Sequence, residues 1–167
     1  MLGRPVFPQW AWLNTTTSPL FRTSDVVMTV FACCQTNVVS VKPDATIGFV
    51  AELMRGKNIG CVIVTDDHRP VGIVTDRDIA LRSHSLCDDP DTTHIETVMT
   101  RDILTIRKDT GIFDAIQEMK TAGVRRMPIV DAGGRLVGLL TVDDLIRLLA
   151  REMADIARII GKESPSI

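Results

Sequence analysis

The chain has 167 residues, of which 45% are hydrophobic and 24% are charged, and its formal net charge is −2. This length suits one compact domain or two small ones that share a core, and the composition is that of a globular protein. The small net charge provides no global basic field, so we expect neither nucleic acid nor an anionic membrane as a partner. No apolar run approaches the ~20 residues of a transmembrane helix.

Residues 1–27 show no periodicity, and we interpret them as an irregular N-terminal tail. Pro5 and Pro8 interrupt its weak apolar stretch, which makes the tail a poor secretory signal peptide. Two alternatives stay open for Trp10 and Trp12: they pack on the rest of the protein or on a partner. Met28 is an alternative functional start, which would make the tail an upstream addition.

The cysteine pattern indicates a reducing compartment, and we therefore predict a cytoplasmic location. The four cysteines show no CxxC spacing and no disulfide framework; they are Cys33, Cys34, Cys61 and Cys87. His84, Cys87 and His94 are residue types that bind zinc, but their spacing is irregular and a fourth ligand is missing. We expect no metal and no cofactor.

An internal repeat at a spacing of 65 to 66 residues dominates the sequence. A segment that begins at Val38 aligns with one that begins at Ile103. The agreements in one register pair Asp44 with Asp109, Ile47 with Ile112, Met54 with Met119, Val64 with Val130, Gly72 with Gly138, Thr75 with Thr141, and Asp78 with Asp144. The chain therefore contains two copies of one structural unit.

Each copy predicts the same elements in chain order. In the first copy these are a strand at Val39–Val41, a helix with an apolar stripe from Ile47 to Met54, strands at Cys61–Val64 and Val71–Val74, and a helix after Thr75. In the second copy they are a strand at Leu104–Ile106, a helix with a stripe from Ile112 to Met119, strands at Met127–Val130 and Leu136–Leu140, and a helix after Thr141. The predicted class is α+β, with two pseudo-symmetric β-α-β-β-α repeats packed face to face, because one copy of about 50 residues buries little core.

The predicted organisation is a tail at 1–27, repeat 1 at 28–83, a linker at 84–97, repeat 2 at 98–150, and a C-terminal helical extension with a frayed end at 151–167. Thr46 and Thr110 stand where helix N-caps are expected, and Gly56 and Gly123 stand near the helix ends.

The last helix carries an apolar stripe in near-heptad steps that extends past the repeat. Its members are Leu145, Leu148, Leu149, Met153, Ile156, Ile159 and Ile160. We favour a subunit interface for this stripe; the alternative is a helix that folds back on its own domain.

The order of elements resembles the cystathionine β-synthase (CBS) domain, and two copies in tandem resemble a Bateman module of the stand-alone bacterial type. The resemblance lies in VGIVTDRD at 71–78 and VGLLTVDD at 137–144, which fit the family's G-h-h-T/S-x-x-D signature, and in VMTRD at 98–102 and VRRMPIVD at 124–131. Val27-Met28-Thr29 is similar to the start of VMTRD, but VFACCQTN then intervenes before Val38.

The signature has the chemistry that an adenosyl nucleotide requires. Glycine lets the backbone approach a ligand closely, and a helix start presents free N–H groups to a phosphate. Thr75 and Thr141 would serve phosphate or ribose, and Asp78 and Asp144 would accept hydrogen bonds from the ribose hydroxyls. The alternative is that these residues are plain helix caps and first-turn acids.

The resemblance implies that each Thr–Asp pair faces segments of the other copy. The favoured nucleotide site consists of Thr75, Arg77, Asp78, Thr100, Ile103, Arg125, Arg126 and Met127. The weaker site consists of Thr141, Asp143, Asp144, Asn37, Val38, Gly60, Cys61 and Val62. Because the arginines belong to the first set, we expect that site to bind AMP, ADP or ATP. The second would be empty or hold an uncharged or cationic adenosyl ligand such as S-adenosylmethionine. Arg125 and Arg126 have an alternative role as charges that guard a strand edge.

The expected function is regulatory. Nucleotide binding, in the manner of energy sensing, would shift a homodimer between two arrangements that an unknown protein partner recognises. The alternative is a constitutive interaction scaffold with degenerate, unoccupied pockets. The sequence has no nucleophile elbow, P-loop or GxGxxG motif, so we expect no enzyme activity and no catalytic residues.

Overall fold

The computed structural model describes residues 28–86 and 89–163. The first copy contains β1 (Ser40–Val41), α1 (Ile47–Lys57), β2 (Cys61–Asp66), β3 (Arg69–Thr75) and α2 (Asp76–Leu86). The second contains β4 (Thr100–Arg101), β5 (Ile106–Arg107), α3 (Ile112–Ala122), β6 (Arg126–Val130), β7 (Leu136–Thr141) and α4 (Val142–Glu163). Short 3-10 helices, η1 (Val30–Ala32) and η2 (Ile95–Thr97), precede the two copies. The predicted α+β fold with two β-α-β-β-α repeats and a C-terminal helical extension is confirmed.

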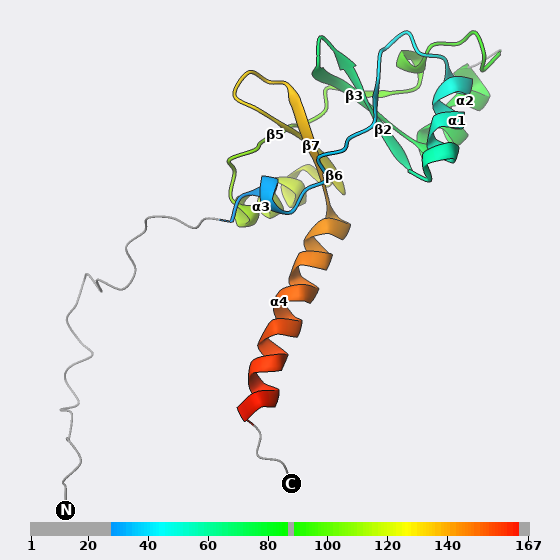
Figure 1. Ribbon diagram of the computed structural model, residues 1–167. Helices are drawn as coiled ribbons and strands as arrows, with labels where there is room; N and C mark the ends of the chain where they lie inside the picture. Colours follow the sequence, from blue (N-terminus) through cyan, green and yellow to red (C-terminus); the bar gives the residue numbers. More distant parts are fainter. Residues whose placement is uncertain (1–27, 87–88, 164–167) are drawn as a thin grey trace, which may run out of the picture.

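The strands form two small sheets with equivalent topology. One has the order β1-β2-β3-β4 and the other has the order β5-β6-β7. In each sheet the first pair is parallel and the second is antiparallel, because a helix connects the first two strands and a tight turn connects the next two. In Figure 1, α1 and α2 lie together beyond the first sheet, and α3 lies beside the second, near the start of α4.

The segment that leads into each copy pairs with the sheet of the other copy. We call residues 30–37 and 95–102 the leading segments. Strand β4 lies in the second of them and pairs with β3, where Thr100 faces Ile73 and Arg101 faces Gly72. Gln35 lies in the first and exchanges two backbone hydrogen bonds with Leu139 of β7, at 3.1 and 2.9 Å. Each sheet is thus completed by the other copy.

The two leading segments are in register without an insertion. The N–H of Val30 donates to the carbonyl of Thr110 at 2.9 Å, and 65 residues later the N–H of Ile95 donates to the carbonyl of Ala45 at 2.7 Å. η1 therefore corresponds to η2, and VFACCQTN corresponds to the residues from Ile95 to Asp102. The expectation that VFACCQTN is an insertion was wrong, because the match of Val27-Met28-Thr29 to Val98-Met99-Thr100 lies six residues too far along the chain.

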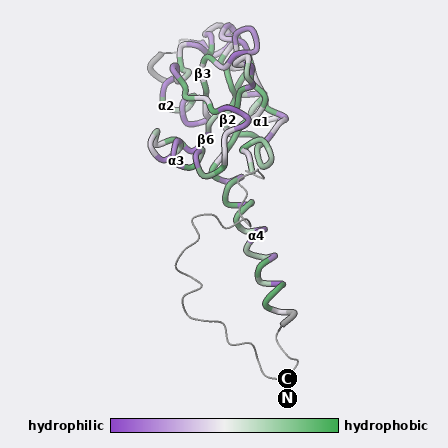
Figure 2. Tube along the Cα trace, turned by 90° about the vertical axis from the view of Figure 1, so that its left-hand side faces the viewer, coloured by the Kyte–Doolittle hydropathy of each residue, from purple (hydrophilic) through white to green (hydrophobic). Residues whose placement is uncertain are grey.

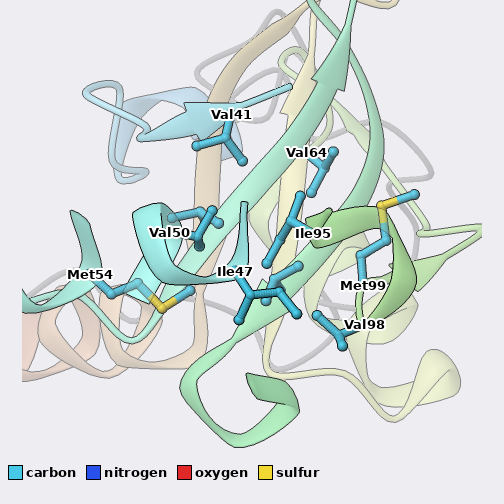
Figure 3. Packing of buried hydrophobic residues seen from close by; sticks show 10 residues of the cluster. Val41, Ile47, Val50, Met54, Val64, Ile95, Val98 and Met99 are labelled. Atoms are coloured by element: carbon cyan, nitrogen blue, oxygen red, sulfur yellow. The ribbon is translucent and has the colours of Figure 1, made fainter. Parts of the chain in front are cut away.

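Two hydrophobic clusters form the core, and a leading segment contributes to each. In the first cluster Ile95, Val98 and Met99 pack against the helix stripe of Ile47 and Val50 (Figure 3). In the second cluster Val30 packs with residues of α3, β5, β6 and β7. Val30 and Ile95 are both fully buried. Since a buried Val or Ile side chain contributes about 1.5–3 kcal/mol, these contacts couple the stability of one copy to the other.

The helix ends agree only in part with the sequence-based prediction. Thr46 is the N-cap of α1, and its side chain accepts a hydrogen bond from the N–H of Phe49 at 3.3 Å. The N-cap of α3 is Gly111 and not Thr110. Helix α1 continues through Gly56 to Lys57, and its C-cap is Asn58, which has a φ of 52°. The C-cap of α3 is Gly123, with a φ of 66°, next to the helix end as predicted.

Helix α4 is one unbroken helix of 22 residues, about 33 Å long. Its hydrophobic residues recur along its length in Figure 2, and its second half extends beyond the rest of the described chain (Figure 1). Among the helices of residues 28–86 and 89–163, none has the length and apolarity that crossing a membrane requires. The predicted tail, Cys87 and the Ser-Pro-Ser end lie outside the described residues.

Replacing Gly56 by alanine is expected to stabilise the protein. Gly56 is an exposed residue inside α1, and a Cβ there would meet no atom within 4 Å. Alanine should raise the free energy of unfolding by roughly 0.5–1 kcal/mol, because glycine costs more conformational entropy in a helix. The matched variant Gly123→Ala should lower it by roughly 1 kcal/mol, since its positive φ strains any residue with a Cβ. Chemical denaturation of both variants measures the change in the free energy of unfolding. Changes of the same sign in the two variants would contradict this account.

Candidate functional site

The two Thr–Asp pairs predicted from the repeat form the same hydrogen-bonded motif at the strand-to-helix junctions. The Oδ2 atom of Asp78 accepts from the N–H of Thr75 at 3.0 Å and from its hydroxyl at 2.7 Å. In return the N–H of Asp78 donates to the threonine Oγ1 at 3.1 Å. Thr141 and Asp144 repeat these contacts at 3.0, 2.6 and 3.2 Å. Both pairs are reciprocal caps that satisfy the helix starts.

Each aspartate keeps its second oxygen in looser contact. The Oδ1 atom of Asp78 lies 3.3 Å from Arg82. The Oδ1 atom of Asp144 lies 3.4 Å from the Nε2 atom of Gln35 and 3.5 Å from the Nη1 atom of Arg147. These long contacts are weak, and a carboxylate oxygen has more than one lone pair. The capping role therefore leaves each aspartate one oxygen with which to accept hydrogen bonds from a ligand.

A cavity of about 280 Å³ opens beside Thr141 and lies between the two copies. The first copy and its leading segment supply Gln35, Asn37, Val38, Val39, Asn58, Ile59, Gly60, Cys61 and Ile63. The second copy supplies Arg126, Leu139, Thr141, Asp143 and Arg147. The structure thus brings together most of the residues predicted for the weaker site. Val62 and Asp144 are the exceptions: Val62 is buried in the first core cluster, and the buried Asp144 does not line the cavity but contacts Gln35 and Arg147, which do.

Two arginines line this cavity, although the sequence analysis assigned its arginines to the other site. Arg126 comes from β6 and was assigned to the other site. Its guanidinium lies 3.9 Å from where a Cβ on Gly60 would be, an ordinary contact distance, so Arg126 reaches across to the first copy. Arg147 follows Asp144 by three residues on α4. The cavity wall therefore combines two cations with the carboxylate of Asp143, and the buried carboxylate of Asp144 lies behind it, in contact with Gln35 and Arg147.

The residues predicted for the favoured site lie in several different surroundings. Arg125 lines a groove between α3 and α4, and Met127 is buried in the second core cluster. Arg77 and Thr100 are exposed and Ile103 is half-buried. The guanidinium of Arg82, beside Asp78, donates to the carbonyl of Val98 at 2.9 Å, which holds α2 against the second leading segment. Arg126, which was predicted for the favoured site, lies instead in the wall of the cavity at Thr141.

Sequence reasoning missed Gln35 and Arg147. The spacing of Asp144 and Arg147, i and i+3 on a helix, was a signal that the two side chains share a face. Gln35 was missed because the first leading segment was aligned incorrectly with the second. Gln35 corresponds to Thr100 only when the two leading segments are aligned without an insertion.

The thiol of Cys61 lies in the wall of the cavity. Burial raises the pKa of this thiol; the guanidinium of Arg126 opposes the rise, and the carboxylate of Asp76 adds to it. Burial also raises the pKa of Cys33 and of Cys34. Within the described side chains, which exclude those of His84 and Cys87, no cluster of three or more histidine, cysteine and acidic residues is arranged to hold a metal ion.

Comparison with known sequences gives a consistent family match. The family described as "CBS domain" matches residues 27–85 and 95–151. An uncharacterized 17.7 kDa protein of Acidianus ambivalens is 38% identical over 116 residues, which cover 68% of each chain. An uncharacterized protein of Methanopyrus kandleri is 31% identical over 113 residues, 67% of this chain and 58% of that protein. The match to the inosine-5'-monophosphate dehydrogenase of Methanocaldococcus jannaschii, 31% identical over 112 residues, covers 66% of this chain and only 21% of the enzyme.

Solved structures show the same fold. CBSX2 in complex with AMP is 28% identical, with a TM-score of 0.65 over 75% of this chain and 98% of that one. The CBS domain pair of protein MJ0100, in complex with 5'-methylthioadenosine and S-adenosyl-L-methionine, has the same TM-score of 0.65 at 24% identity, over 75% and 98% of the two chains.

The raised pKa of Cys61 predicts slow alkylation. Because the thiolate is the reactive form, iodoacetamide should modify Cys61 more slowly at neutral pH than it modifies glutathione. The rate should keep rising with pH above the range in which glutathione reaches its plateau. Arg126→Gln should slow the reaction further, because it removes the cation that favours the thiolate. Peptide mapping by mass spectrometry measures each rate, and faster alkylation in Arg126→Gln would contradict the assigned geometry.

Proposed function

Because the chain belongs to the CBS domain family, we propose that it is a regulatory module that binds an adenosyl nucleotide and has no catalysis of its own. The observation that supports this most directly is the cavity at Thr141. Its wall joins a threonine, an aspartate and two arginines with apolar residues of the other copy, and the buried Asp144 contacts Gln35 and Arg147 of that wall. This combination suits a ligand with a flat apolar base, a diol and an anionic group.

Each part of the cavity suits one part of the ligand. The Oδ1 atom of Asp144 would accept hydrogen bonds from the ribose hydroxyls, since its other oxygen is committed to Thr141. Arg126 and Arg147 would neutralise the phosphate through charge-assisted hydrogen bonds. Val38 and Ile59 would contact the base. Two cations favour AMP, ADP or ATP over the sulfonium of S-adenosylmethionine, and this reverses the ranking of the two sites derived from the sequence.

The relatives support a regulatory role. CBSX2 binds AMP, and MJ0100 binds two adenosyl ligands. In the dehydrogenase the matched region is about a fifth of the enzyme, which leaves room for a separate catalytic domain. We propose that this chain also binds an adenosyl ligand and that this binding serves energy sensing. Cys33, Cys34 and Cys61 are free thiols, which favours a reducing compartment such as the cytoplasm.

Signalling would follow from the position of the cavity between the copies. A ligand that contacts both copies favours the arrangement in which the contacts are complete, and a partner protein that recognises this arrangement would respond to ligand. We propose a homodimer as the signalling unit. The exposed apolar residues of the helices, such as Phe49, Leu81 and Phe113, supply surfaces on which two copies could meet.

Nucleotide binding is tested by thermal unfolding and isothermal titration with AMP, ADP, ATP and S-adenosylmethionine. At ~100 times its dissociation constant, a ligand should add about 2.7 kcal/mol to the stability of the folded state. Arg126→Gln and Arg147→Gln should each weaken AMP binding by about 10- to 100-fold, the effect of losing one charge-assisted hydrogen bond. Asp144→Asn should weaken binding similarly, because an amide supplies one acceptor oxygen instead of two.

Asp78→Asn is the matched control, since it makes the same change at the pseudo-equivalent position. If only Asp78→Asn abolished binding, the nucleotide site would be the one at Thr75 and not the cavity at Thr141. If none of the four ligands changed the melting temperature, nucleotide binding would be rejected in favour of the constitutive scaffold. Turnover of any of these nucleotides would contradict the non-catalytic role.

A further inference from the structure

A groove of about 820 Å³ runs between β1 and one side of α1, on the first copy. Val41 of β1 and Val50 of α1 pack in the same core cluster, which holds the strand and the helix side by side (Figure 3). The strand side of the groove consists of residues 37–42, and the helix side includes Phe49, Leu53 and Lys57. Phe49 is 57% exposed, so an aromatic ring lies open to solvent along the groove.

The strand side of the groove presents an open backbone edge. β1 is the outermost strand of its sheet and, among the described residues, pairs only with β2. The carbonyl of Val39 accepts a hydrogen bond from the N–H of Ile63 at 3.1 Å, and the backbone groups of successive residues in a strand point to opposite edges. The N–H and C=O of Ser40, the next residue, therefore point away from β2. Such an edge is a template to which another extended segment can add as a strand.

The second copy shows that the fold does not require the apolar side of this groove. At the spacing of 65 residues that relates α1 to α3, Phe49 corresponds to Asp114 and Leu53 corresponds to Glu118. Both acidic residues are exposed on α3. The same helix face is thus apolar in the first copy and acidic in the second, so its apolar character belongs to this groove and is not a requirement of the repeat.

The charges of the groove are not neutralised within the described part of the chain. Lys42, Lys57 and Asp44 line it, and none of the three forms an ion pair there. In the second copy, by contrast, the residue equivalent to Lys42 is Arg107, which pairs with Asp109 at 3.0 Å. Because the chain runs along β1 and returns along α1, the two lysines lie toward opposite ends of the groove. The groove therefore suits an extended segment with an apolar middle and acidic ends.

The charges also decide between the occupants that an edge strand can have. Two copies that paired β1 to β1 would place the lysines of one groove beside those of the other, and like charges oppose such a contact. Residues 1–27 carry two arginines and one aspartate, so they do not supply the acidic ends either. Leu81 and Phe113 lie outside the groove, so a homodimer that used these exposed residues would leave it open.

We propose that this groove binds an extended acidic segment of another protein, which adds beside β1 as a further strand. The backbone of the segment would bond to Ser40, and its apolar side chains would cover Phe49 and Leu53. Acidic residues at its two ends would lie beside Lys42 and Lys57.

The groove shares part of its wall with the cavity at Thr141. Asn37, Val38 and Val39 line both spaces. A nucleotide in contact with Val38 would hold the same stretch of backbone to which the segment adds. AMP should therefore tighten the binding of the segment at least about fivefold, and by linkage the segment should tighten the binding of AMP by the same factor. This coupling rests on the proposed function, whereas the docking of the segment does not.

Peptide binding to the full, isotope-labelled chain tests the groove by nuclear magnetic resonance. The probe is an acetylated nonapeptide with valine at three alternate central positions, threonine between them and two acidic residues at each end. It should shift the amide signals of Ser40 and Phe49, and a peptide with lysine in place of the acidic residues should bind at least about tenfold more weakly. Shifts at Thr105 and Asp114, the equivalent positions of the second copy, in place of those at Ser40 and Phe49 would overturn the proposal.

Two N-methylated forms of the peptide test strand addition. One form is methylated on the backbone nitrogens of the valines and the other on those of the threonines, so each lacks the N–H groups of one edge of the strand. Only one of the two forms should lose binding, because the segment pairs with β1 along a single edge. Equal affinities of the two forms would contradict strand addition.

Three variants of the chain locate the contact. Phe49→Asp introduces the residue that the second copy has at the equivalent position, and it should weaken peptide binding at least about tenfold. Lys57→Ala should weaken it about two- to fivefold, the effect of losing one exposed ion pair. Arg55→Ala is the matched control, because it removes a cation from the same helical turn outside the groove, and it should leave the dissociation constant within about twofold. Circular dichroism melting checks that each variant is folded, and unchanged binding in Phe49→Asp would reject the groove.

Hydrogen exchange of the chain without peptide tests whether the edge is open. The N–H of Ser40 should exchange rapidly and should become protected when the acidic peptide binds. Slow exchange without peptide would show that residues 1–27 or a second copy already cover the edge, and it would overturn the proposal.

Titration with AMP separates this inference from the proposed function. Peptide binding by a chain that does not bind AMP would support the docking groove and reject the nucleotide function. AMP binding by a chain that does not bind the peptide would reject the groove alone. If the chain binds both, equal peptide dissociation constants with and without AMP would overturn the coupling.

Discussion

The exchange of leading segments between the two copies is the constraint on which the rest of the structure depends. Strand β4 completes the sheet of the first copy, and Gln35 adds to the sheet of the second. The exchange requires glycine at two points. A Cβ on Gly72 would lie 2.5 Å from the sulfur of Met99, and one on Gly138 would lie 2.8 Å from the sulfur of Cys34. The glycines of the repeated signature therefore have a packing reason that does not depend on a ligand.

This exchange also builds the cavity. Gln35 and Asn37 reach the Thr141 side only because their segment crosses to β7, and the wall at Gly60 and Cys61 comes from the first copy. A ligand in the cavity would touch both copies at once, so its binding energy would depend on how the copies are arranged. The same geometry links the cavity to α4, because Thr141, Asp144 and Arg147 surround the start of that helix. Ligand binding in the cavity would then be coupled directly to the orientation of α4, with no other helix or strand needed to connect them.

The two pseudo-equivalent sites differ because the repeats have diverged at a few positions. Cys61 corresponds to Arg126, because Cys61 pairs with Thr75 and Arg126 pairs with Thr141, so the second copy carries a long basic side chain where the first carries a thiol. Arg82 joins Asp78 to the carbonyl of Val98, whereas the second oxygen of Asp144 is approached by Gln35 and Arg147. One junction is thus tied to its neighbouring segment, and the other lines an open cavity.

The sequence by itself determined the two β-α-β-β-α units, the pairing of Thr75 with Asp78 and of Thr141 with Asp144, and the apolar stripe of α4. These features depend on local periodicity and on contacts within four residues, which a repeat makes visible twice. It did not determine the helix ends at Gly111 and Asn58, where a shift of one or two residues costs little energy.

Only the tertiary structure decided which site receives Arg126, where Gln35 lies and which of the two Thr–Asp pairs is buried. The physical reason is that a strand residue such as Arg126 lies near the boundary of two pseudo-symmetric sites. Its long side chain can extend toward either site, and only the packing of the two copies against each other decides that it lines the cavity at Thr141.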